Sequence, residues 1–182
     1  MANSEHAIAR IIYRYNLKGF LTIYLSQEWQ NNAWTNISQR LYSYDDNNNI
    51  LNRLDKNWEN NSWINYRQEL YYYDDNNNIL NYLEQFWQND TWVNCQQDTY
   101  TYDSKNNMLS DLWQKWQNNT WVNYELWTYS YDDNNNRLSL LTQFGYNGIL
   151  YFTTLESVLG GIGGSELILF LMNTMPLLLI KE

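Results

Sequence analysis

Residues 58–86 read WENNSWINYRQELYYYDDNNNILNYLEQF, and this stretch decides the fold because its pattern recurs every 29 residues. Each copy contains two tryptophans around an Asn-rich pair, a Tyr-x-Tyr-Asp motif, an asparagine tract and two leucines. The tryptophan pairs of successive copies are Trp29 and Trp34, Trp58 and Trp63, Trp87 and Trp92, and Trp116 and Trp121. A tandem repeat of this length indicates an array of similar small structural units.

The segments between the turn motifs favour strands over helices, because they are about ten residues long and rich in Tyr, Trp, Thr, Ile and Val. Within residues 58–63, Asn60 and Asn61 predict a two-residue type I′ turn, since asparagine tolerates the positive φ that both central positions require. Trp58 then faces Trp63 across the hairpin, at a pair where side chains approach closely.

The second turn of each copy has the pattern Tyr-Asp-x-x-Asn. Asp45 suits the first position of a type I turn, and Asn48 suits the left-handed residue that completes a bulge. Gly19 and Gly164 occupy the same position in the flanking copies, which fits a requirement for positive φ. The chain has 29 Asn against 7 Gly, so turn formation explains most of the asparagine excess.

The sequence therefore predicts an all-β fold: an antiparallel meander of about ten strands built from 29-residue double-strand repeats, forming an open coiling sheet or a barrel. Three regions follow from the repeat, namely an N-terminal segment over 1–12, tandem repeats over 13–144, and a degenerate copy with an apolar cap over 145–182. Strict alternation along the strands would place Trp34 and Tyr42 on the same face.

Composition excludes several classes of function. The net charge is −9 and the pI is about 4.5, which argues against a nucleic-acid partner. Cys95 is the one cysteine and His6 the one histidine, so neither a disulfide framework nor His-based catalysis is expected. No cofactor is implied by any motif.

Neither end of the sequence predicts a membrane span. Residues 1–16 contain no basic segment followed by a long apolar core, so no secretory signal is recognisable. The apolar stretch at 167–180 has only 14 residues and is interrupted by Asn173, Thr174 and Pro176, whereas about 20 are needed to cross a bilayer. We expect a terminal strand or a docking tail there.

The motif Tyr-Asp-x-x-Gly/Asn-x-Leu, as in 15–21 (YNLKGFL) and 44–50 (YDDNNNI), resembles the YD repeats of the RHS family. The longer unit with paired tryptophans resembles tandem repeats of secreted bacterial surface proteins, and the likeness covers roughly 13–145. This resemblance implies surface display, adhesion, or a β-shell that encloses toxin segments, and an extracellular or cell-surface location. The period differs, being 29 here rather than near 21, and the location itself stays unknown.

Repeated aromatic and amide side chains suggest a ligand surface, because indole and phenol rings stack on sugars while amides bind their hydroxyls. Trp113 and Trp127 stand apart because they break the repeat. The candidate ligand-binding set comprises Trp34, Asn36, Tyr42, Trp63, Asn65, Tyr71, Trp92, Asn94, Trp113, Trp121, Asn123 and Trp127.

Metal binding and catalysis are not expected. The start of the asparagine tract imitates a calcium loop, but Ile50 stands where glycine is required and Lys56 where glutamate is required. Glycoside hydrolysis needs a paired set of carboxylates. The acids Glu69, Glu84, Asp111 and Glu125 share no motif, so we expect no enzyme.

The functional prediction is a non-catalytic repeat β protein that serves as a surface, adhesion or scaffold module. Two alternatives stay open, a carbohydrate-binding module and a shell fragment of an RHS-type toxin system. The partners would be a glycan, a protein surface, or a second copy joined edge to edge through strands near 10–16 and 167–172.

Overall fold

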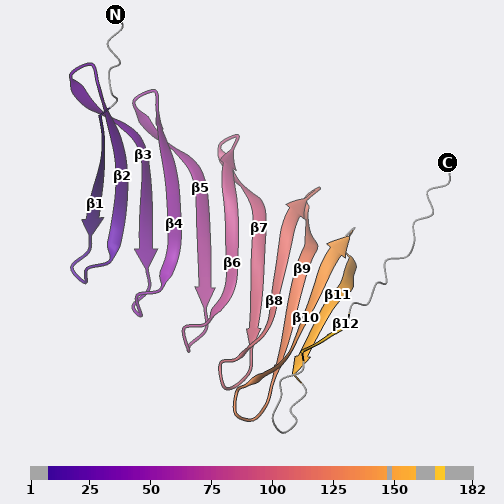
Figure 1. Cartoon of the computed structure of the whole chain (residues 1–182). Helices are drawn as coiled ribbons and strands as arrows, with labels where there is room; N and C mark the ends of the chain where they lie inside the picture. Colours follow the sequence, from indigo (N-terminus) through magenta and orange to yellow (C-terminus); the bar gives the residue numbers. More distant parts are fainter. Residues whose placement is uncertain (1–7, 147–148, 159–166, 171–182) are drawn as a thin grey trace, which may run out of the picture. The chain divides into compact units, whose positions relative to one another are not determined.

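The structure, a computed structural model, describes residues 8–146, 149–158 and 167–170 (Figure 1). In these residues all regular elements are strands, and neighbours in sequence are neighbours in one antiparallel ladder from β1 to β12 that does not close. No helix among them is long and apolar enough to cross a membrane. The strands are β1 (Ala9–Tyr15), β2 (Leu21–Gln30), β3 (Ala33–Tyr44), β4 (Ile50–Glu59), β5 (Ser62–Tyr73), β6 (Ile79–Gln88), β7 (Thr91–Tyr102), β8 (Met108–Gln117), β9 (Thr120–Tyr131), β10 (Arg137–Tyr146), β11 (Ile149–Val158) and β12 (Leu167–Phe170).

This topology confirms the predicted all-β meander, and the described residues form twelve strands instead of about ten. The chain divides into two compact units, which are treated separately below. Unit 1 is Met1–Tyr72 with Leu83–Asn94, and unit 2 is Tyr73–Tyr82 with Cys95–Glu182. In such an array each strand is stabilised by its immediate neighbours.

The tight hairpins adopt the predicted geometry. Asn60 and Asn61 have φ of 48° and 61°, and Glu59 pairs with Ser62 while Trp58 pairs with Trp63. The rings of Trp58 and Trp63 meet edge to face, with centroids 4.9 Å apart. Positive φ at both central residues recurs at Asn31 and Asn32, at Asn89 and Asp90, and at Asn118 and Asn119. The predicted turn at 147–148 lies outside the described residues.

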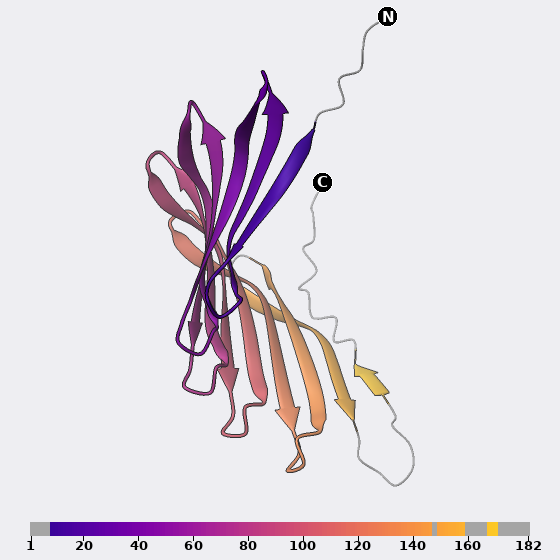
Figure 2. The same ribbon diagram turned by 90° about the vertical axis from the view of Figure 1, so that its left-hand side faces the viewer.

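The Tyr-Asp turns also follow the prediction, and Figure 2 shows them as longer loops than the tight hairpins. The backbone N–H of Asn48 donates to the carbonyl of Asp45 (3.1 Å), and φ at Asn48 is 71°. The Asp45 carboxylate accepts from the backbone N–H of Asn49 (2.8 Å) and from its side-chain amide (3.0 Å). Gly19 has φ of 86° at the equivalent position, while Gly164 lies outside the described residues.

One feature of the strands was not predicted. Asn36 pairs with Gln27 and Ser38 with Ser26, so Ile37 is an extra residue that forms a β-bulge in β3. Tyr66 in β5 and Tyr124 in β9 are extra residues in the same way. Because each bulge shifts the alternation by one residue, the expectation that Trp34 and Tyr42 share a face is wrong.

The two faces of the sheet therefore differ in chemistry. The amide face carries the paired tryptophans and the side chains of Gln27 and Asn36, as their pairing shows. The charged face carries Tyr42 and the paired residues Arg40 and Asp55. No apolar side chain of the described residues is buried, so the apolar groups of both faces stay partly exposed.

Candidate functional site

The amide face carries rows of side-chain hydrogen bonds that run across the strands. In unit 1 the amide of Gln68 donates to Gln85 (2.5 Å), and Gln85 donates to Asn94 (2.7 Å). In unit 2 Gln97 donates to Gln114 (2.6 Å), and Gln114 to Asn123 (2.7 Å). Such amide ladders stabilise stacked strands. They also engage asparagines that the sequence suggested for ligand binding.

The predicted ligand set does not form one surface. Tyr42 and Tyr71 lie on the charged face, as do Trp113 and Trp127. The remaining eight lie on the amide face: Trp34, Asn36, Trp63, Asn65, Trp92, Asn94, Trp121 and Asn123. Each of the four tryptophans in this group packs edge to face on its hairpin partner. These contacts between indole rings stabilise the hairpins.

On the charged face of unit 1, six ionised side chains form one continuous ladder. Arg40 Nε contacts Asp55 Oδ1 (2.6 Å). Burial lowers the pKa of Arg40, but the hydrogen bond and the charge of Asp55 outweigh burial, so the pKa is raised. The ladder runs in the order Arg40, Asp55, Arg53, Glu69, Arg67 and Glu84, and Arg53 lies 3.0 Å from Glu69. Glu69 and Glu84 are buried, with 4% and 6% exposed. Burial raises the pKa of Glu84 although Arg67 opposes the shift.

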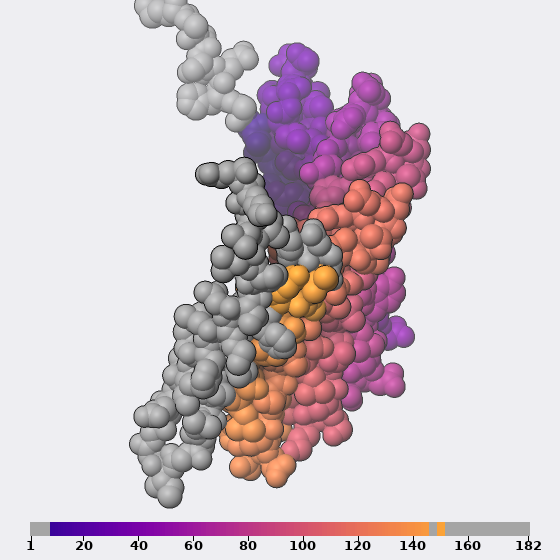
Figure 3. Space-filling model, turned by 90° about the vertical axis from the view of Figure 1, so that its right-hand side faces the viewer, coloured from indigo at the N-terminus to yellow at the C-terminus, as the bar shows by residue number. Residues whose placement is uncertain are grey.

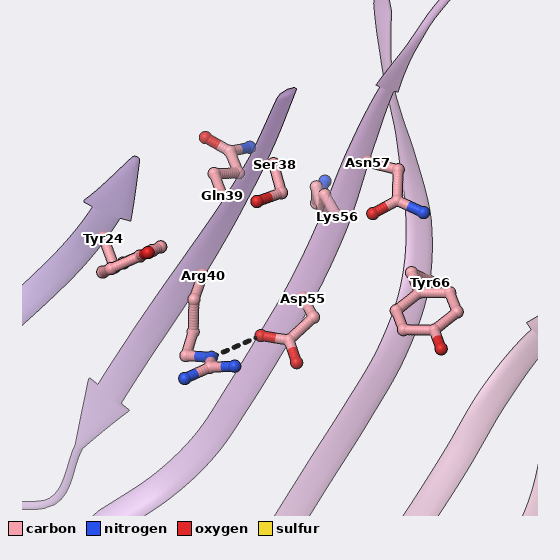
Figure 4. A pocket seen from close by; sticks show the side chains of 8 residues that line it. All are labelled: Tyr24, Ser38, Gln39, Arg40, Asp55, Lys56, Asn57 and Tyr66. Atoms are coloured by element: carbon pink, nitrogen blue, oxygen red, sulfur yellow. Dashed lines mark hydrogen bonds and ion pairs between the residues drawn. The ribbon is translucent and has the colours of Figure 1, made fainter. Parts of the chain in front are cut away.

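The start of this ladder borders a hollow of about 190 Å³, shown in Figure 4. The Arg40–Asp55 ion pair lies between the rings of Tyr24 and Tyr66. Ser38 contributes a small side chain where the next copy has Arg67, which leaves this space open. The lining residues are Tyr24, Ser38, Gln39, Arg40, Asp55, Lys56, Asn57 and Tyr66. Polar groups between two aromatic rings suit a small polyhydroxylated ligand.

The charged face of unit 2 is built differently. Figure 3 shows that residues of β8, β9 and β10 lie at the surface. Asp111 pairs with Trp127, and Trp113 pairs with Glu125, so acids and indoles alternate across β8 and β9. We call Asp111, Trp113, Glu125 and Trp127 the acidic–aromatic patch. Neither acid has an ion-pair partner in the described part of the chain.

The pKa values of the two acids in this patch are raised. Oδ1 of Asp111 is buried and has no hydrogen-bond partner. Burial raises the pKa of Asp111, and burial together with the Asp111 charge raises the pKa of Glu125. Lys115 lies over the rings of Tyr124 (3.8 Å) and Trp113 (4.7 Å), which places a cation on an aromatic surface at the edge of the patch.

Sequence reasoning found Trp113 and Trp127 by their departure from the repeat, but it did not connect them to Asp111 and Glu125. The pairing of β8 with β9 brings Asp111, Trp113, Glu125 and Trp127 together. No sequence motif indicates this pairing. Among the described residues no cluster of three metal-ligating side chains occurs.

Comparisons with known proteins address the fold. No protein-family model matches the chain, and no curated protein matches its sequence significantly. The crystal structure of TcdB2-TccC3-Cdc42 is similar, with a TM-score of 0.52 and 16% identity. It covers 91% of this chain, which spans 9% of that one. At this identity the likeness concerns the fold alone, and it agrees with the all-β architecture.

Two smaller proteins are more distantly similar. A protein of unknown function from Bacteroides fragilis has a TM-score of 0.45 and 13% identity. The match covers 63% of this chain and 88% of that protein. A DUF3836 family protein from Bacteroides vulgatus has a TM-score of 0.33 and 15% identity, with 63% and 97% coverage.

Proposed function

We propose that this chain is a non-catalytic β-repeat module that acts as a scaffold or adhesion surface. The observation that carries the proposal is the absence of buried apolar side chains among the described residues, which leaves both faces of the sheet available to partners. The fold similarity to TcdB2-TccC3-Cdc42 supports the same class of protein. A shell segment of an RHS-type toxin system is the narrower form of this proposal.

A substrate panel tests the non-catalytic part of the proposal. The purified chain should show no turnover of glycosides, peptides or esters above heat-treated protein. Turnover that disappears in Asp111→Asn or Glu125→Gln would overturn it, because these two acids are the ones with raised pKa and no ion-pair partner.

Carbohydrate binding is the second candidate, and the hollow between Tyr24 and Tyr66 supports it. Titration with mono- and disaccharides should quench or shift the intrinsic fluorescence, and Arg40→Met should weaken the binding by removing the polar centre of the hollow. Asp46→Asn is a useful control because this exposed turn side chain does not line the hollow. No saturable signal with any sugar would remove this candidate.

Edge-to-edge association is a further way for the scaffold to bind a second copy. β1 ends the ladder and exposes Ile11, Tyr13 and Tyr15 by 49%, 50% and 60%. An unpaired strand edge offers free N–H and C=O groups to another strand. Light scattering should show concentration-dependent dimers that Ile11→Lys disrupts, whereas a monomer at all concentrations would exclude this mode.

A further inference from the structure

The repeat allows equivalent positions of the two units to be compared directly. In unit 1 the charged face places Arg40, Arg53 and Arg67 between its carboxylates. Two periods of 29 residues after Arg53 stands Asp111, and two periods after Arg67 stands Glu125. Three periods after Arg40 stands Trp127. Unit 2 has therefore lost all three guanidinium groups of the ladder and has gained two acids and an indole.

This exchange leaves charge that the described part of unit 2 does not neutralise. Asp111 and Glu125 have no ion-pair partner there, whereas Glu69 and Glu84 of unit 1 each contact an arginine. An ionised carboxylate that is half-buried without a counter-charge is unfavourable, and a cation supplied from outside relieves this cost.

The indoles of the patch add a second attraction for cations. Trp127 pairs directly with Asp111, so a cation there would meet a carboxylate and a ring face together. The chain already uses this chemistry, because Arg10 lies 4.2 Å from the Trp34 ring and, at the edge of the patch, Lys115 lies 4.7 Å from the Trp113 ring.

We propose that the acidic–aromatic patch binds an arginine-rich segment of another protein, whose guanidinium groups contact the carboxylates of Asp111 and Glu125 and the ring of Trp127. This inference rests on the proposed scaffold function and names the chemistry of one partner. Arginine suits the site better than lysine, because its planar group binds carboxylates with two hydrogen bonds and stacks on indoles. Charge complementarity with a chain of net charge −9 favours encounter with such a partner.

The test uses the full chain and a fluorescent peptide of alternating arginine and serine, with a lysine–serine peptide as comparison. Anisotropy should show saturable binding that weakens with salt and is stronger for arginine than for lysine. Asp111→Asn combined with Glu125→Gln should weaken binding by about tenfold or more. The matched control is Asp46→Asn with Asp75→Asn, which removes two exposed turn charges and should leave the affinity nearly unchanged.

A second variant keeps the test independent of folding defects. Trp127→Arg places a guanidinium opposite Asp111, so it should raise the thermal midpoint while abolishing peptide binding. Equal losses in the patch and control variants, or no preference for arginine, would overturn the proposal. Binding of a glycan panel to the patch in place of the peptide would also overturn it. None of these outcomes depends on the turnover assays that test the scaffold function.

Discussion

At the scale of single residues, asparagine occupies most of the turn positions of this sheet that need a positive φ. Asn31, Asn60, Asn61 and Asn118 have positive φ between 48° and 61°, a region that costs other non-glycine residues roughly 1–2 kcal/mol. Two turns per copy require such residues, and the chain has only 7 glycines. The asparagine excess therefore follows from backbone geometry.

Substitution at Asn61 should reveal this requirement. Asn61→Ala should be less stable than Asn61→Gly by about 1 kcal/mol, because alanine meets the left-handed strain and glycine does not. Urea unfolding of both variants measures the difference. Asn47 is an exposed turn asparagine without positive φ, so alanine should be the more stable substitution there. The same order at both positions would contradict the assignment.

The ionisation of two aspartates should affect stability with opposite sign. The side-chain amide of Asn78 donates to Asp74 (2.9 Å) and lowers its pKa, whereas burial raises the pKa of Asp111. Ionised Asp74 therefore adds stability above pH 3.8 that is lost as the pH falls through its lowered pKa, while ionised Asp111 reduces stability as the pH rises above 3.8.

Unfolding midpoints from pH 2 to 7 check both signs. Asp74→Asn should destabilise the chain at pH 7, and Asp111→Asn should stabilise it. The Asp111 difference should shrink as the pH falls toward 3.8, and the Asp74 difference should shrink as the pH falls from 3.8 through its lowered pKa. A destabilising Asp111→Asn at neutral pH would show that Asp111 has a partner in its ionised state.

At the scale of elements, sequence predicted the hairpins well because turn chemistry is local. Asn60 and Asn61 fix the turn, and the turn fixes the pairing of Trp58 with Trp63. The bulges at Ile37, Tyr66 and Tyr124 could not be predicted, since these residue types also occur in regular strands. The expectation that Trp34 and Tyr42 share a face was wrong for that reason.

The candidate site shows the same limit. Trp113 and Trp127 were visible as departures from the repeat, whereas Asp111 and Glu125 were indistinguishable from other scattered acids. The pairing of β8 with β9, with its bulge at Tyr124, places each of these acids beside one of the two tryptophans.

The tryptophan pair of a hairpin should behave as one energetic unit. Replacing Trp58 and Trp63 by valine, singly and together, should give a coupling energy of about 0.5–1.5 kcal/mol, as expected for an edge-to-face pair. A control cycle between Trp29 and Trp63, which belong to different hairpins, should be additive within roughly 0.5 kcal/mol. Equal coupling in both cycles would indicate a general effect of indole loss.

At the scale of the whole molecule, stability comes from contacts between neighbouring strands, because the described residues bury no apolar side chain. The Tyr44 hydroxyl on β3 donates to the carbonyl of Leu21 on β2 (2.7 Å), and in unit 2 Tyr102 donates to Ile79 (3.0 Å). These links join adjacent strands only. An array of this kind tolerates changes in the number of units better than changes in their register.

Deleting one complete period tests this directly. Removal of residues 30–58 joins Trp29 to Glu59 and recreates the sequence of a tight hairpin, so β2 should pair with β5 in the register that it has with β3. The shortened chain should keep a β-sheet circular dichroism spectrum, with a urea m-value lower by about a sixth because less surface is exposed on unfolding. Removal of 30–57 is the matched control, since the extra residue reverses the faces of one strand against the next and should abolish cooperative unfolding. Two variants of equal stability would show that register is not what holds the sheet together.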